Sequence, residues 1–275
     1  MPDEKIFPHQ EMPYLKERLE SPTCVVATAY SGLLVWLESC MASIQKLNLF
    51  TILSYDGPSI PPRQISELAS ITTIIPHSQT TLNYYSLVHW KLALPIVEEL
   101  GFKYVFVLCA DNYIEKPEGF PELLKKMEGY DVLTYWQDGN TRIGVGRVGT
   151  MAWICTVPAW RAILDRVSAI WYEYPACGKV EEKVSKAIFQ LGLKLAPTME
   201  PNEKYDFRLA PDGWNGVEHQ NRGIFGRLIG LRHLHRECEL RNQQNLKPLE
   251  KKFLDLRYQH AFVPNGLREI YKNEK

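Results

Sequence analysis

The sequence predicts an α/β protein with a mostly parallel sheet and helices on both of its faces. Between about residues 23 and 198, short β-rich apolar runs alternate with longer runs in which apolar residues recur every three to four positions. The run Tyr104–Cys109 is apolar throughout, which is typical of a strand buried on both faces. Strands that alternate with helices form parallel βαβ units, and this rhythm therefore determines the predicted class.

The individual elements follow from apolar periodicity and from the Gly and Pro residues that interrupt it. Strands are expected at 23–29, 50–54, 71–75, 104–109, 131–135, 151–157 and 194–197. Helices are expected at 33–46, 62–69, 82–100, 117–127, from 158 onward, at 180–191 and at 246–256. The sequence Tyr-Asp-Gly-Pro at 55–58 predicts a turn after the second strand.

No linker divides the chain, and we expect a single domain over 1–275. Residues 1–22 are predicted to be an irregular lead-in and 23–198 the α/β core. From about residue 200 the alternation stops, which favours a loop-rich C-terminal extension (199–275) that covers the active site. Within it, 200–245 is expected to be a long loop or short helices that fold back over the sheet.

Composition narrows the functional classes. Hydrophobic residues make up 45% of the chain and the formal net charge is zero, so a large core is expected and no overall basic field favours nucleic acid or an anionic membrane. No membrane span or signal peptide is evident. The cysteines form no CxxC pair, which indicates buried thiols of a reduced cytoplasmic protein rather than disulfides or a zinc site; they are Cys24, Cys40, Cys109, Cys155, Cys177 and Cys238.

Polar residues follow three of the predicted strands. The first strand leads into Thr28-Ala-Tyr30, the second into Tyr-Asp56-Gly, and the fourth into Cys109-Ala-Asp111-Asn. An acidic residue at such a position caps the next helix, binds a ligand hydroxyl or amide, or holds a metal. Ligands of parallel sheets bind at the carboxyl ends of strands, near the switch point in strand order. The chemistry is therefore expected at this edge.

Five segments in this order resemble the GT-A fold of glycosyltransferases, especially family 2-like nucleotide-sugar transferases. They are VVATAYSGLLVWLESCMASI, FTILSYDGPS, HWKLALPIVEELGFKYVFVLCADNYIEKPEGFPELLKKM, VGTMAWICTVPAWRAIL and the acidic pair before KVSKAIFQLGLKL. The resemblance covers about residues 23–198. It implies a GT-A-like (Rossmann-like) sheet and a hexosyltransferase-like enzyme that uses a UDP-sugar in preference to a GDP-sugar.

The resemblance also implies roles at the donor site. Asp56 is expected to read the nucleotide base, with Thr28 and Tyr30 beside it. Asp111, with Asn112 adding a neutral oxygen, is expected at the position of the DxD motif, where Mn²⁺ or Mg²⁺ bridges the two phosphates of the donor. The alternatives are structural: a turn residue for Asp56, a core aromatic for Tyr30, and a helix cap or Asx turn for Asp111.

Two further sets of residues have implied roles. One of His233 and His235 would add a metal ligand, and Arg232, one of a series of arginines, would face the diphosphate; a solvent-facing basic segment is the alternative. Glu182, or its neighbour Glu181, would be the general base of an inverting transfer. The alternative for this pair is stabilisation of the helix dipole, and a retaining mechanism needs no such base.

Cys109 departs from the family pattern, because it replaces the first Asp of the DxD motif. That substitution motivates a second hypothesis, a nucleotide-binding degenerate GT-A scaffold without catalysis. The acceptor stays open among a glycan, a lipid-linked sugar, a protein and a modified nucleic-acid base. The arginine series keeps a polyanionic acceptor such as DNA among the alternatives.

Overall fold

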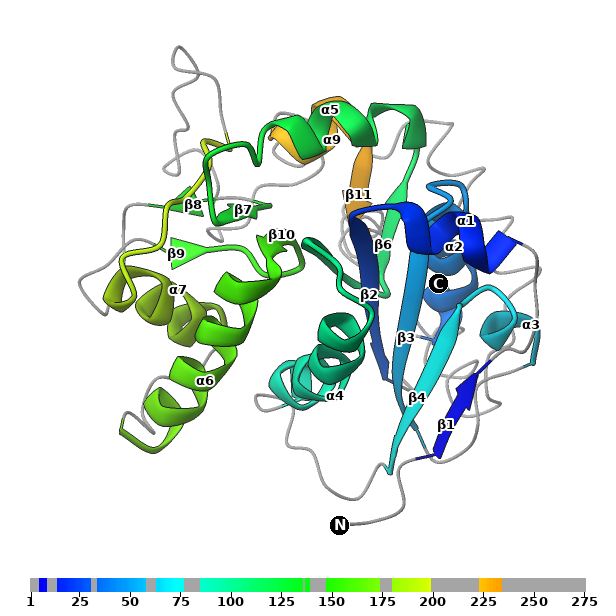
Figure 1. The fold of residues 1–275 in the computed structure, drawn as a ribbon, viewed down its shortest axis with the longest axis horizontal. Helices are drawn as coiled ribbons and strands as arrows, with labels where there is room; N and C mark the ends of the chain where they lie inside the picture. Colours follow the sequence, from blue (N-terminus) through cyan, green and yellow to red (C-terminus); the bar gives the residue numbers. More distant parts are fainter. Residues whose placement is uncertain are drawn as a thin grey trace, which may run out of the picture.

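The chain folds around a seven-stranded sheet with the order β1-β4-β3-β2-β5-β10-β7 (Figure 1). The computed structural model describes residues 5–8, 14–30, 34–57, 63–76, 85–135, 137–138, 147–173, 180–198 and 223–233. In that order the strands are Lys5–Pro8, Ile71–Pro76, Phe50–Gly57, Thr23–Tyr30, Tyr104–Cys109, Ala152–Thr156 and Val132–Thr134. Two small sheets pair β6 (Asn112–Ile114) with β11 (Leu231–His233), and β8 (Gln137–Asp138) with β9 (Arg147–Val148).

Most strands of the large sheet run in the same direction. β2, β3, β4 and β5 form parallel pairs, and β7 runs with them because it is antiparallel to β10, which is itself antiparallel to β5. Only β1 and β10 run in the opposite direction among the strands described. The predicted mostly parallel α/β sheet is therefore confirmed.

Helices cover both faces of the sheet, as predicted. One face carries α2 (Leu34–Gln45), α3 (Arg63–Ser66), α5 (Phe120–Lys125) and α9 (Ile224–Ile229), and the other carries α4 (Tyr85–Glu99), α6 (Val157–Glu173) and α7 (Val180–Gln190). A 3₁₀ turn (Pro117–Gly119) precedes α5, and α1 spans Tyr14–Glu20. Strand residues alternate between the two cores: Val25 and Ala27 face α2, whereas Cys24 and Val26 face α4.

The second strand is longer than the sequence predicts. Instead of turning at Tyr55-Asp56-Gly57, β3 continues through Gly57. It is paired on both sides there, with Tyr30 of β2 opposite Asp56 and Pro76 of β4 opposite Gly57. Ladder hydrogen bonds to two neighbours override the local turn preference of these residues.

The chain ends differ from the predictions in other ways. The irregular lead-in contains β1 and α1. The expected strand at 194–197 is reduced to one isolated parallel bridge between Leu195 and Val132. Of the C-terminal extension, the structure describes only 223–233, a short helix and a strand, and the predicted helix at 246–256 lies outside the described residues.

The predicted burial of the cysteines is confirmed for the four that the structure describes. Cys24, Cys40, Cys109 and Cys155 are free thiols, all buried or half-buried; Cys177 and Cys238 lie outside the described residues. Within the described ranges, no helix has the length and apolar content that crossing a membrane requires.

Candidate functional site

Three predicted site segments meet at one edge of the sheet. β2 lies between β3 and β5, and its residue Tyr30 is opposite Asp56 while its residue Thr28 is opposite Cys109. The backbone N–H of Ala110 donates to the Thr28 carbonyl at 2.9 Å. From β2 the chain proceeds to β3 and β4 on one side, and β5 is added on the other. This edge is therefore a topological switch point, where ligands of α/β sheets bind.

Asp56 is a carboxylate held within a regular strand. Its side chain is only 1% exposed, on the face of the sheet that α4 covers. Burial raises the pKa of the adjacent Tyr55 to about 12, and the negative charge of Asp56 adds to that shift. The residues that flank Asp56 in the ladder fix its backbone on both sides, so the carboxylate has a defined position at the switch point.

Asp111 follows β5 in the tight turn that leads into β6, and its side chain is 6% exposed. The Asn112 amide nitrogen donates to Asp111 Oδ1 at 3.2 Å, to the Cys109 carbonyl at 3.0 Å and to the Met151 carbonyl at 3.5 Å. The two N–H groups of the amide point toward these acceptors, which orients the side chain. Its oxygen, Asn112 Oδ1, is buried and has no hydrogen-bond partner among the described residues.

Cys109 supplies a neutral thiol where the family resemblance expects a carboxylate. Burial raises its pKa well above the usual range, and the charge of Asp111 and a hydrogen bond with its carboxylate raise it further. Cys40 of α2 donates its S–H to the Cys109 carbonyl at 3.8 Å. Around this turn, Asp111 is thus the carboxylate and Cys109 and Asn112 are its neutral neighbours.

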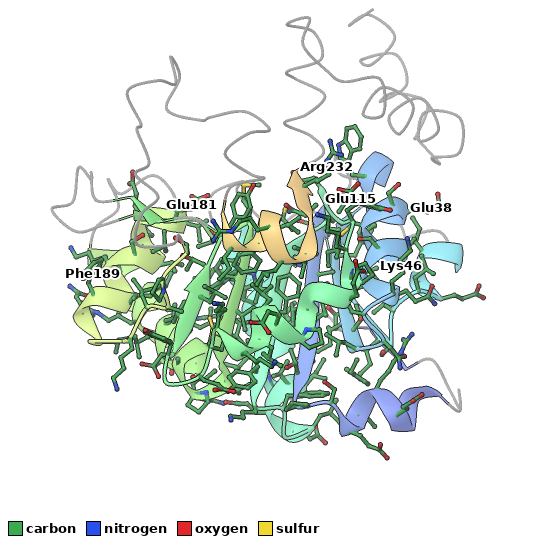
Figure 2. All side chains as sticks on the ribbon, turned by 90° about the horizontal axis from the view of Figure 1, so that it is seen from above. Glu38, Lys46, Glu115, Glu181, Phe189 and Arg232 are labelled. Carbon is green, nitrogen blue, oxygen red and sulfur yellow. The ribbon has the colours of Figure 1, made fainter. Side chains whose placement is uncertain are left out.

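A segment more than a hundred residues later in the sequence returns to this turn. β11 pairs with β6 so that Arg232 is opposite Tyr113 and His233 is opposite Asn112. The half-buried Arg232 is labelled in Figure 2, along the same margin as Glu115. The backbone of His233 therefore lies beside the Asp111 turn, while its side chain and all of His235 lie outside the described part.

The predicted metal ligands do not form a complete cluster within the described side chains. Among those side chains, no group of three or more His, Cys, Asp and Glu residues could hold a metal ion. Asp111 and Asn112 offer two adjacent side chains with oxygen atoms. Because hard divalent cations take oxygen ligands and keep several from water or phosphate, this pair fits Mg²⁺ or Mn²⁺.

Glu181 and Glu182 lie in the first turn of α7, both half-buried. Helix α7 packs against α6 and β9, so the structure does not place the pair on the strand ends themselves. Ser185 anchors this turn: its hydroxyl donates to the Glu181 carbonyl at 2.5 Å and accepts the N–H of Val148 at 3.0 Å. In Figure 2, Glu181 lies along the margin of the molecule that also carries Arg232.

Two buried residues near Asp56 were not predicted. His89 of α4 and Ser54 of β3 are joined by a 2.6 Å hydrogen bond between Nδ1 and Oγ, and both are fully buried. The sequence signal for them is weak: a serine two residues before the strand-end aspartate, and a histidine next to the apolar stripe of a helix.

Comparisons with known proteins add little to this geometry. No protein-family model and no curated protein matches the chain. Among solved structures, it is similar to a protein of Desulfovibrio desulfuricans G20 assigned as a nucleotide-diphospho-sugar transferase, with 12% identity and a TM-score of 0.46 over 82% of this chain and 100% of that one. Nothing about the activity of this chain follows from a similarity at that level.

Proposed function

We propose that this chain is a glycosyltransferase that moves a sugar from a nucleotide-sugar donor, UDP-linked in preference to GDP-linked, to an acceptor hydroxyl. One observation carries the proposal: two buried carboxylates lie at the topological switch point, Asp56 near the carboxyl end of β3 and Asp111 just after β5, on either side of β2. A nucleotide-sugar has two polar parts, a nucleoside and a diphosphate. In this proposal Asp56 meets the nucleoside and Asp111 meets the diphosphate.

In the proposed arrangement the nucleoside lies against β2 and β3. Asp56 accepts hydrogen bonds from the base, and Thr28 and Tyr30 complete that side. The diphosphate lies toward the turn after β5, where Asp111 and the oxygen of Asn112 would hold Mn²⁺ or Mg²⁺ and Arg232 would face the phosphates. When bound, such a cation neutralises the charge that develops on the leaving diphosphate.

Glu182 is the proposed general base, with Glu181 as the alternative member of the pair. The acceptor oxygen forms a bond to the anomeric carbon as the bond from that carbon to the phosphate oxygen breaks. The proton of the acceptor hydroxyl passes to the glutamate, and the nucleoside diphosphate leaves. This assignment applies to an inverting transfer, whereas a retaining transfer leaves the pair without this role.

A second candidate is a nucleotide-binding scaffold without catalysis. The observation that favours it is the neutral Cys109, which leaves a single carboxylate in the turn that would meet the diphosphate. This candidate predicts nucleotide binding that divalent cations do not strengthen, and no turnover of any donor.

Thermal unfolding with UDP, GDP, CDP and ADP, each with Mn²⁺ or with EDTA, separates these candidates. A ligand at about 100 times its Kd stabilises the native state by about 2.7 kcal/mol, which raises the midpoint by several degrees. We expect the largest shift with UDP and Mn²⁺, reduced by EDTA and lost in Asp56→Asn. A shift that ignores the metal favours the scaffold, and no shift with any nucleotide refutes both.

A further inference from the structure

A row of hydroxyl side chains crosses the sheet just below Asp56. Thr28 of β2 is opposite Ser54 of β3, which is opposite Thr73 of β4, and all three are buried. Ile52, two residues before Ser54, belongs to the apolar core under α4. Because residues two apart in a strand share a face, the row and Asp56 lie on this same side. The α4 face of β3 therefore changes from apolar to hydroxyl to carboxylate toward its carboxyl end.

His89 joins this row to the covering helix. Its Nδ1 lies 2.6 Å from Ser54 Oγ, so α4 contacts the hydroxyl row through a directional bond. Burial lowers the pKa of His89 to about 3, and the imidazole is therefore neutral at physiological pH. Either the serine hydroxyl donates to the ring or, in the other tautomer, the ring donates to the hydroxyl.

The bond contributes orientation more than stability. A buried neutral hydrogen bond adds a net of about 0.5–1.5 kcal/mol, and apolar side chains of the same shape would serve the core as well. Thr73 Oγ1, in the same row, is buried without a hydrogen-bond partner among the described residues. A polar layer that packing alone does not require, placed directly below the buried carboxylate of Asp56, indicates a role in setting geometry.

We propose that His89 is a positioning residue for the nucleoside side of the site: through Ser54 it fixes the end of β3 against α4 and thereby holds Asp56 in place. This inference rests on the proposed function, in which Asp56 binds the nucleoside. Loss of the bond leaves the diphosphate side intact, because Asp111 is held by Asn112 on a different strand end.

The test compares the binding of UDP and of inorganic pyrophosphate, both with Mn²⁺, by calorimetry. We expect His89→Leu and Ser54→Ala each to lower the affinity for UDP about tenfold. The affinity for pyrophosphate should stay within twofold of wild type. The double variant should bind UDP no more weakly than either single variant, because the same hydrogen bond is lost in all three proteins. His89→Asn, whose amide can take the place of Nδ1, should restore the affinity for UDP to within threefold of wild type.

Val97→Ala is the matched control, because Val97 is a fully buried residue of α4 outside the hydroxyl row. It should lower stability and leave both affinities unchanged. If His89→Leu binds UDP as the wild type does, or loses UDP and pyrophosphate equally, the positioning inference is wrong while the proposed function stands.

If the wild type binds no nucleoside diphosphate, the proposed function is refuted. Hydrogen exchange of the backbone amides at 54–57 then tests separately whether His89 fixes the end of β3. Faster exchange of these amides in His89→Leu, reversed in His89→Asn and absent from Val97→Ala, supports the positioning role. Equal exchange in all four proteins overturns it.

Discussion

Acid is expected to destabilise this protein more steeply than a variant without His89. The ring is fully buried in α4, and burial lowers its pKa from 6.5 to about 3. In the unfolded chain the imidazole is in water and titrates at its ordinary pKa. Between these two values the unfolded chain binds a proton that the folded protein does not. The contribution of the neutral ring to the free energy of unfolding is therefore fully present above pH 6.5, and it is lost as the pH falls toward 3.

The magnitude follows from this interval. Each pH unit below 6.5 removes about 1.4 kcal/mol, which amounts to about 2 kcal/mol at pH 5. The assay is urea unfolding, followed by tryptophan fluorescence, of the wild type and His89→Asn at several pH values from 8 to 5. The variant keeps an amide near Ser54 but does not titrate, and the difference between the two proteins isolates this one group.

Two results would contradict a neutral, buried His89. Parallel stability curves from pH 8 to pH 5 would mean that the folded protein protonates His89 as readily as the unfolded chain does. A wild type that gains stability relative to the variant on acidification would mean that the folded state holds a charged imidazole. In either case the folded protein would not hold His89 as a neutral ring.

The other predictions concern the proposed site and its support. Asp111→Asn should lower transfer about 100-fold or more in a radiolabelled-donor assay, because the charge stabilisation by the cation is lost. Stability should be unchanged, because the amide keeps the shape of the carboxylate; unchanged turnover contradicts the metal assignment. Glu182→Gln should lower turnover about 10²–10⁴-fold with donor Kd unchanged, and Glu181→Gln much less; loss of donor affinity alone contradicts the base. Gly119→Ala should lower stability by about 1–3 kcal/mol in urea, because its Cβ would overlap the Leu228 backbone; an unchanged midpoint contradicts this packing.

The local sequence pattern was sufficient to predict the helices and strands that bury an apolar face. β2 and β5 and helices α2 and α7 lie close to their predicted bounds, because each combines a clear periodicity with a Gly, Pro or polar residue at its end. The antiparallel direction of β10 was harder to predict from the sequence. A parallel neighbour needs a crossover connection, and the described residues between β7 and β10 form only the short strands β8 and β9, so β10 returns antiparallel to β7.

The elements that the sequence could not predict are short and depend on distant partners. β6 and β11 are each three residues long, too short for an alternating pattern, and they form only because the chain returns across the end of the sheet. The strand-end carboxylates were predicted by position. Their environments were not, since the Ser54–His89 bond and the contacts of Asn112 come from segments far apart in the sequence.

The two carboxylates of the proposed donor site thus depend on different supports. Asp56 lies in a strand paired on both sides and rests on the layer that contains Ser54 and His89. Asp111 lies in a turn continuous with β6, which is held by β11 and by a backbone hydrogen bond from the N–H of Lys116 to the Ile229 carbonyl of α9 at 3.0 Å. The two supports use different side chains, Ser54 and His89 for Asp56 and Asn112 for Asp111, and they meet at the backbone of Thr28, whose carbonyl accepts the N–H of Ala110 at 2.9 Å. Each half of the site should therefore respond mainly to a change in its own side chains. A change near His89 should weaken the nucleoside half, and a change that shifts α9 should weaken the diphosphate half.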